Sequence, residues 1–333
     1  MLRWIFILFF LPGSLPAQEK RFHFTENKMG SPFNIIFYHT DSSEADVISK
    51  MCFAIVDSLN KIFSDYSPGS EISLLAENAY LEPQPVSDNL LFILKESKNA
   101  WNKSGKVFDI SIGPLTSLWR KARKEKRFPS KLEIRKAKRL IGFNKLQVDT
   151  LNKTVFFTQK GLRLDFGGIV KGYAAQKVID YLISKKILHA LADAGGDIVM
   201  SQPPPGKNGW TVGINMPQHE NQIWHQDLSL VNCSVATSGD VYQFISHNGK
   251  KYSHIIDPRT GYGVTSQRNV TVIAKDGITA DWLATACSIL PINKALHLAN
   301  KENSALLIAI VRNEKIVIYK TDNFDSFLQK KEP

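Results

Sequence analysis

The sequence predicts an α+β fold in a single mature domain, on three observations. Helical and strand patterns follow one another along the 333 residues without the regular strand–helix–strand repetition of a doubly wound sheet. No internal repeat or low-complexity linker divides the chain. Apolar residues make up 43% of the sequence, which is enough for one large core.

The N-terminus is typical of an export signal. Arg3 precedes an apolar run over 4–11, Pro12 and Gly13 break this run, and Ala17 could end a cleavage site. The run is too short to span a bilayer, which takes about 20 residues. No cysteine lies near residue 17 to carry a lipid anchor. We therefore expect residues 1–17 to be a signal peptide and residues 18–333 to form one exported domain, periplasmic or otherwise extracytoplasmic, with attachment to the membrane surface as an alternative.

The first third of the mature chain predicts a strand, two helices and a second strand. The strand covers 33–39, and a long helix over 44–63 has an apolar face made by Val47, Met51, Ile55, Leu59 and Ile62. Residues 63–71 are rich in turn formers. A second helix begins near the N-cap Ser87 and ends near Lys103. The alternating segment 107–112 predicts a short strand that ends at Gly-Pro.

Residues 119–139 carry most of the formal net charge of +11, with eleven Lys and Arg against two Glu. Such a segment could bind nucleic acid, anionic lipid or an acidic protein, or could be the solvated face of helices that turn at 128–130. No aromatic ladder or nucleic-acid motif accompanies the charge, so we expect no nucleic-acid partner.

The rest of the chain predicts a hairpin, two helices and several strands. The hairpin covers 146–149 and 154–158, and the helices cover 169–184 and 280–290. One strand is expected over 190–199 around a Gly-Gly kink, and a Pro/Gly loop follows over 201–209. Further strands are expected over 210–215, 268–274, 304–311 and 314–320. Cys52 and Cys287 lie in helical apolar patterns and are expected to be buried, and the three cysteines allow at most one internal disulfide.

The segment 164–175, LDFGGIVKGYAA, is the most informative part of the chain. It places Asp165, two glycines and Lys171 at the start of a predicted helix. Free amides and the positive end of the helix dipole make such a place suitable for phosphate groups and hard cations. The string matches neither of the two common nucleotide-binding fingerprints.

Three further clusters carry polar groups. Asp281 and Thr285 are four residues apart on a predicted helix, so their oxygens share one face and suit Mg²⁺, although each residue is also ordinary in a helix. His254 stands before an Asp-Pro turn and could be a general base or purely structural. Residues 237–240, TSGD, could cradle a ligand or form a plain loop; the setting of Ser238 is not that of a hydrolase nucleophile.

Together these features resemble the ApbE family of FAD:protein FMN transferases. The resemblance extends over nearly all of the mature chain, through eight segments in the family's order: 29–35, 63–73, 107–115, 164–175, 193–198, 236–240, 254–264 and 279–286. The sequence departs from the family pattern at Gly168, where relatives often have Ala, at Gly263 in GYGV, and at Val241. A backbone ligand at 168 is expected to tolerate Ala.

The resemblance implies an α+β fold related to the T-fold, with FAD as substrate and Mg²⁺ as cofactor in one cleft. It implies FAD contacts by Met29, Tyr66, Val107, Phe108, Asp109, Asp165 and Lys171, with His254 and Ile255 against the flavin. The Mg²⁺ ligands implied are the carbonyl of Gly168 with Asp281 and Thr285. His254 is a candidate for accepting the proton of the attacking hydroxyl, and Asp257 is its rival.

The activity implied is Mg²⁺-dependent transfer of FMN from FAD to a threonine hydroxyl of an acceptor flavoprotein, with release of AMP. Two alternatives remain at this point: hydrolysis of FAD to FMN and AMP by the same site, and an extracytoplasmic flavin-binding protein without turnover. The acceptor and the oligomeric state cannot be read from the sequence.

Overall fold

A computed structural model describes residues 18–214, 226–239, 244–312 and 315–329 of the chain. The predicted signal peptide therefore lies outside the described residues, as do Asp240, Val241 and the last residue of the strand expected over 210–215. Within the described part, none of the helices is both long and apolar enough to cross a bilayer.

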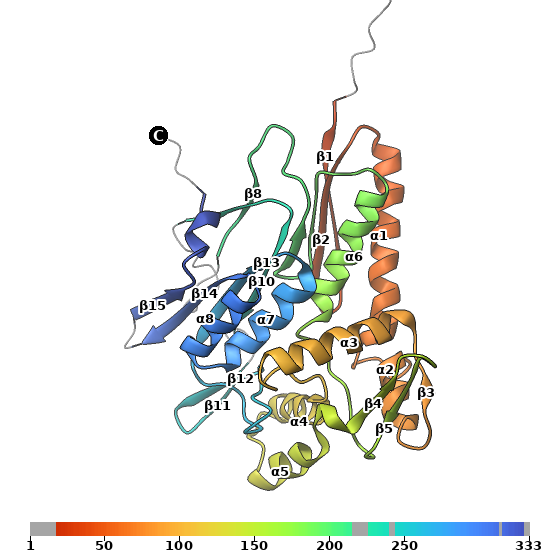
Figure 1. Cartoon of the computed structure of the whole chain (residues 1–333), viewed down its shortest axis with the longest axis vertical. Helices are drawn as coiled ribbons and strands as arrows, with labels where there is room; N and C mark the ends of the chain where they lie inside the picture. Colours follow the sequence, from red (N-terminus) through yellow and green to blue (C-terminus); the bar gives the residue numbers. More distant parts are fainter. Residues whose placement is uncertain (1–17, 215–225, 240–243, 313–314, 330–333) are drawn as a thin grey trace, which may run out of the picture.

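The fold is built around one antiparallel sheet of eight strands in the order β1-β2-β6-β7-β10-β13-β14-β15 (Figure 1). The strands are β1 (Lys20–Lys28), β2 (Ser31–His39), β6 (Ala190–Asp193), β7 (Asp197–Met200), β10 (Cys233–Gly239), β13 (Arg268–Ala274), β14 (Ala305–Arg312) and β15 (Lys315–Lys320). All neighbouring pairs run antiparallel. This sheet confirms the predicted α+β class.

Both faces of the central strands are buried, because side chains of a strand alternate between the two faces. In β14, Leu306, Ile308 and Ile310 belong to the main core, whereas Leu307 and Ala309 belong to a second core. Four helices cover the first face: α1 (Ser42–Phe63), α6 (Val170–Ser184), α7 (Gly277–Ile289) and α8 (Ile292–Lys301). The second face is covered by the two-stranded sheet of β8 (Trp210–Val212) and β9 (Leu228–Leu230) and by the 3₁₀ turn η2 (Phe324–Phe327).

The remaining elements extend beyond one end of the sheet, the lower end in Figure 1. They are α2 (Glu71–Asn78), β3 (Gln84–Pro85), α3 (Asp88–Lys103), α4 (Gly113–Lys124), α5 (Lys131–Leu140), the 3₁₀ turn η1 (Phe143–Lys145), β4 (Leu146–Asp149), β5 (Thr154–Phe157), β11 (Phe244–His247) and β12 (Lys250–Ser253). Strands β3, β5 and β4 form a small sheet, and β11 pairs with β12.

Most predicted elements are present, but three predictions were wrong in detail. On α1, Val47 and Met51 are 60% and 49% exposed, and the buried face is one residue further along the helix, with Ile48, Cys52 and Val56. The strand expected over 190–199 is two strands, β6 and β7, because Gly195 and Gly196 adopt φ values of +73° and +101° and reverse the chain. Cys52 and Cys287 are buried, as expected, and both are free thiols.

The third error concerns residues 107–112, which form a tight loop rather than a strand. The Asp109 carboxylate accepts hydrogen bonds from the backbone N–H of Ser111 at 2.9 Å and from its hydroxyl at 2.6 Å, and this local closure replaces strand pairing. Gly113-Pro114 then begins α4 instead of ending a strand, since proline is well suited to the first turn of a helix.

Candidate active site

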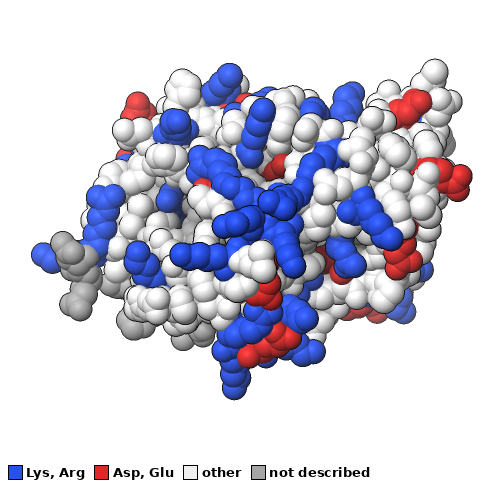
Figure 2. Space-filling model, turned by 90° about the horizontal axis from the view of Figure 1, so that it is seen from below, with Lys and Arg blue, Asp and Glu red and all other residues white. Residues whose placement is uncertain are grey.

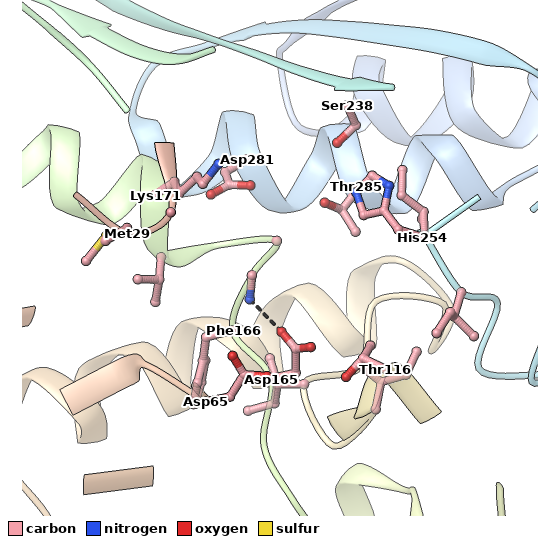
Figure 3. A pocket seen from close by; sticks show the side chains of 18 of the residues that line it. Met29, Asp65, Thr116, Asp165, Phe166, Lys171, Ser238, His254, Asp281 and Thr285 are labelled. Atoms are coloured by element: carbon pink, nitrogen blue, oxygen red, sulfur yellow. Dashed lines mark hydrogen bonds between the residues drawn. The ribbon is translucent and has the colours of Figure 1, made fainter. Parts of the chain in front are cut away.

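A cleft of about 670 Å³ lies between the helical face of the sheet and the lower elements. The residues that line it are contributed by segments from Met29 to Ile289 in the sequence. A volume of this size is typical of small-molecule and cofactor sites. Figure 3 shows two groups of polar side chains facing each other across the cleft, one on α6 and α7 and one around Asp65 and Asp165.

The first group is arranged by the close contact of α6 with α7. A Cβ on Gly172 would lie 2.0 Å from the carbonyl oxygen of Gly277, so only glycines allow the two backbones to approach this closely. At this contact, Asp281 of α7 accepts a hydrogen bond at 3.0 Å from the N–H of Gly172 in the first turn of α6. Asp281 therefore caps a helix to which it does not belong, where the dipole favours negative charge.

Asp281 is 4% exposed, and burial raises the pKa of its carboxyl well above the usual range. Asp197 raises that pKa further, whereas the Gly172 N–H and Lys171 lower it. Burial also raises the pKa of Asp197 to about 7, with Asp193 adding to the shift and Lys171 opposing it. Two carboxyls and one ammonium at the floor of the cleft therefore form a site that favours additional positive charge.

Thr285 lies one turn further along α7, and Gly168 lies against it. A Cβ on Gly168 would be 2.7 Å from the Thr285 hydroxyl and 3.2 Å from its Cβ, so alanine at 168 would require Thr285 to move. The expectation that position 168 tolerates Ala considered only the backbone carbonyl of Gly168 and not its contact with Thr285. The set of a carboxylate, a hydroxyl and an accessible carbonyl fits a hard cation, which prefers oxygen ligands. In the described part of the chain, no group of three or more His, Cys, Asp and Glu offers a denser metal site.

The second group is arranged around Arg120. Its guanidinium donates to Asp65 at 2.8 Å, lies 3.9 Å from Asp165, and stacks over the Tyr66 ring with Cζ 4.0 Å from the centroid. Burial raises the pKa of Asp65, Asp165 raises it further, and Arg120 opposes the rise. Asp165 also accepts a hydrogen bond from the N–H of Gly167 at 2.8 Å (Figure 3).

Backbone turns position the remaining residues of the cleft. Met29 is in the two-residue turn between β1 and β2, where it and Gly30 have φ values of +50° and +79°. The loop carrying Val107, Phe108 and Asp109 is tied to the 164–168 segment by the hydrogen bond from the N–H of Asp165 to the carbonyl of Ile110. Burial raises the pKa of Asp109, opposed by the hydrogen bonds from Ser111.

The structure thus brings together nearly all the residues that the sequence singled out. Twelve of them line the cleft: Met29, Tyr66, Val107, Phe108, Asp109, Asp165, Gly168, Lys171, His254, Ile255, Asp281 and Thr285. Ser238, at the end of β10, also faces the cleft (Figure 3). Asp257 is not among the lining residues, and its carboxylate accepts hydrogen bonds from Arg259 at 2.8 and 2.9 Å.

Sequence reasoning missed Arg120 and Arg123 as cleft residues, because they were counted with the basic surface. Both line the cleft together with Thr116. The positions 116, 120 and 123 share one face of α4, so the helical spacing was a usable signal. Asp65 and Asp197 lie inside recognised segments but were not singled out.

The fold and the cleft define a class of protein: an α+β protein whose cleft combines a lysine and an arginine with one buried and several half-buried carboxylates, as suits a phosphate-bearing ligand together with a cation. The family model of the ApbE family matches residues 29–308. The chain belongs to the ApbE family.

Curated relatives and solved structures agree with this membership. A FAD:protein FMN transferase of Vibrio cholerae is 26% identical over 322 residues, covering 95% of this chain and 94% of that protein. One of Chlamydia muridarum is 29% identical over 287 residues, covering 84% and 88%. The crystal structure of the Pseudomonas stutzeri flavinyl transferase ApbE has a TM-score of 0.82 at 27% identity, covering 93% of this chain and 97% of that one. The ApbE protein of Thermotoga maritima has a TM-score of 0.85 at 25% identity, covering 93% and 100%.

Proposed function

We propose that this protein transfers the FMN part of FAD to a threonine hydroxyl of an acceptor protein and releases AMP. One observation carries the proposal: the segments that resemble the flavin transferases, although spread from Met29 to Thr285, meet in a single cleft. The names of the curated relatives support the same activity.

The residues at the start of α6 are suited to the diphosphate. The N-cap position Ile169 provides no side-chain cap, and Lys171 is in the first turn and lines the cleft. The N–H of Gly172 is already bonded to Asp281, so the ammonium of Lys171 is the group here that would bind the phosphate oxygens. Tyr66 and the 107–109 loop, which is held next to Asp165, line another part of the cleft and would contact the rest of the dinucleotide.

Asp281, Thr285 and the carbonyl of Gly168 would hold Mg²⁺. The fit is supported by the Asp281 carboxyl, which is 4% exposed and whose pKa is raised first by burial and then by Asp197, so that a cation bound there would favour its charged form. When bound, Mg²⁺ supplies charge neutralisation for the diphosphate and for the leaving phosphate.

His254 is the base that accepts the threonine proton. It is exposed at the rim of the cleft, where an acceptor side chain can reach it. The threonine oxygen attacks the FMN-side phosphorus, the bond to the AMP phosphate breaks, and the proton passes to the imidazole. Asp257 is the weaker candidate, because its carboxylate is engaged by Arg259 and does not line the cleft.

The test is to incubate the purified protein with FAD and Mg²⁺, with and without a co-purified threonine-bearing acceptor domain. Mass spectrometry should find an FMN adduct on the threonine, and the adduct should be absent with Asp281→Ala. The open cleft and the exposed His254 also admit water, which favours FAD hydrolysis as the second candidate. Rapid FMN release without acceptor, with no adduct, would indicate hydrolysis. Tight FAD binding that Asp281→Ala leaves unchanged, with no product at all, would indicate a binding protein.

The proposed site of action is extracytoplasmic. The signal peptide that the sequence predicts over 1–17 supports this proposal. N-terminal sequencing of the protein secreted from cells would test it by showing whether the mature chain begins near Gln18.

A further inference from the structure

Helices α4 and α5 and the turn between them form a strongly basic surface, which we call the α4–α5 surface. Its exposed cations are Lys121, Lys124, Lys126, Lys131, Arg135, Lys136, Lys138 and Arg139. Figure 2 shows the face of the molecule on which these helices lie, with Lys and Arg crowding its centre and fewer Asp and Glu among them.

Most of these charges are not neutralised within the chain. The two acidic residues of the segment, Glu125 and Glu133, both pair with Arg127, at 2.6 and 2.9 Å. Glu125 also lies 3.9 Å from Lys121. In the part of the chain that the structure describes, Lys124, Lys126, Lys131, Arg135, Lys136 and Arg139 have no ion-pair partner. Like charges gathered in this way repel one another and do not stabilise the fold, so stability does not explain why the cations are clustered here.

The α4–α5 surface adjoins the cleft through α4, and it adjoins the loop that follows His254 through α5. Arg123 of α4 lines the cleft, while the next residue, Lys124, is exposed. On the other helix, the ammonium of Lys138 donates to the carbonyl of Arg259, and a Cβ on Gly261 would lie 2.8 Å from the Ile134 side chain. Helix α5 therefore supports the loop that follows His254, and the same helix carries the exposed cations Lys131, Arg135 and Lys136.

We propose that the α4–α5 surface binds an acidic face of the acceptor protein, next to the threonine that receives the FMN. This inference rests on the proposed function, since only an acceptor has to reach His254. A protein partner fits the geometry better than a bilayer does. A membrane lying flat against this surface would cover the rim at which His254 is exposed, whereas an acidic protein segment can cross the surface and insert its threonine into the cleft.

The test compares three sets of charge variants in the full mature chain. The first reverses Lys131, Arg135 and Lys136 to Glu, and the second changes the same residues to Gln in case the reversal disturbs folding. None of these residues lines the cleft. The matched control reverses Lys50, Lys294 and Lys301, which are also exposed and, in the described chain, also without an ion pair.

The probes are two labelled peptides, each with one threonine, flanked in one by Asp and in the other by Asn. In the presence of FAD and at low salt, the unaltered protein should bind the Asp peptide about tenfold more tightly than the Asn peptide. The Glu set should remove this preference, the Gln set should reduce it, and the control set should keep it. Equal binding of both peptides, or a preference that survives in both the Glu and Gln sets, would overturn the inference.

Two further measurements separate this inference from its alternatives. Co-sedimentation with vesicles of phosphatidylglycerol and phosphatidylcholine tests the membrane. If the Glu set no longer binds the vesicles but still binds the Asp peptide as the unaltered protein does, the surface is a lipid contact and the inference is wrong. FAD binding, followed by flavin fluorescence, should be the same in all variants. If the unaltered protein does not bind FAD, the proposed function fails, whatever the peptides show.

Discussion

Replacing Gly172 by Ala tests whether the contact of α6 with α7 positions the proposed metal site. The new Cβ would lie 2.0 Å from the carbonyl oxygen of Gly277 and 2.9 Å from Cβ of Asp281, so the two helices have to separate by on the order of 1 Å. Overpacking of this kind costs about 1–3 kcal/mol. For a domain of this size the melting temperature should then fall by roughly 2–10 °C. Alanine is the better helix former by about 1 kcal/mol, so a net loss would point to the contact itself.

The effect on activity should be larger than the effect on stability. A displacement of about 1 Å at a catalytic group can cost roughly 100-fold in rate, and Mg²⁺ requires oxygen ligands at about 2.0–2.1 Å. Transfer of FMN, titrated with Mg²⁺, should therefore be slower in Gly172→Ala and need more metal. Gly69→Ala is the control, because a Cβ there meets nothing within 4 Å. Unchanged melting temperature and unchanged Mg²⁺ midpoint in Gly172→Ala would refute the reasoning.

Three further predictions concern single side chains of the cleft. Asp281→Asn should abolish Mg²⁺-dependent transfer yet stabilise the metal-free protein at neutral pH. The pKa of Asp281 is higher in the native state than in the unfolded state. Between these two pKa values only the native state holds the proton, so the unaltered protein should lose stability as the pH rises above the ordinary Asp value. Thermal unfolding from acid to neutral pH checks this, and an equal pH dependence in the Asn variant would contradict it. Arg120→Gln should weaken FAD binding about tenfold, or about 1.4 kcal/mol. Adding Asp65→Asn should restore part of the affinity, because Arg120 compensates the charge of the Asp65 carboxylate. Strictly additive losses of affinity in a fluorescence titration would refute this coupling. His254→Ala should slow transfer at saturating FAD by about 10²–10⁴-fold with little change in FAD binding, and an unchanged rate would exclude it as the base.

Local patterns predicted the elements whose pairing is also local. The β4–β5 hairpin and helices α6 and α7 agree with the sequence within a few residues, because apolar periodicity and caps specify them directly. The loop at 107–112 was misread because its alternation resembles a strand, whereas the Asp109 carboxylate competes for the backbone. The face of α1 was misread because Val47 and Met51 are apolar without being buried, and burial is set by the sheet beneath the helix.

The site was predictable where a motif concentrates polar groups, and not where tertiary structure assembles them. Asp281 and Thr285 share a helix face by spacing alone. Arg120 could not be connected with Asp65 and Asp165, because the three come from separate segments that only the fold brings within 4 Å. Its charge was therefore counted with the basic segment around it. The sequence shows which charges are present, and the structure shows which of them face the cleft.

The distribution of charge in and around the cleft suits the three ligands of the proposed reaction. Burial raises the pKa of both Asp281 and Asp197, so a divalent cation bound beside them would favour their charged forms. Lys171 and Arg123 line the walls and favour the anionic diphosphate. The unpaired cations of the α4–α5 surface lie outside, where they favour an acidic acceptor. Each of these charged regions would favour a ligand of opposite sign. Burial of the Asp281 carboxyl is a cost to the metal-free fold above the ordinary Asp pKa, and a bound cation would offset that cost.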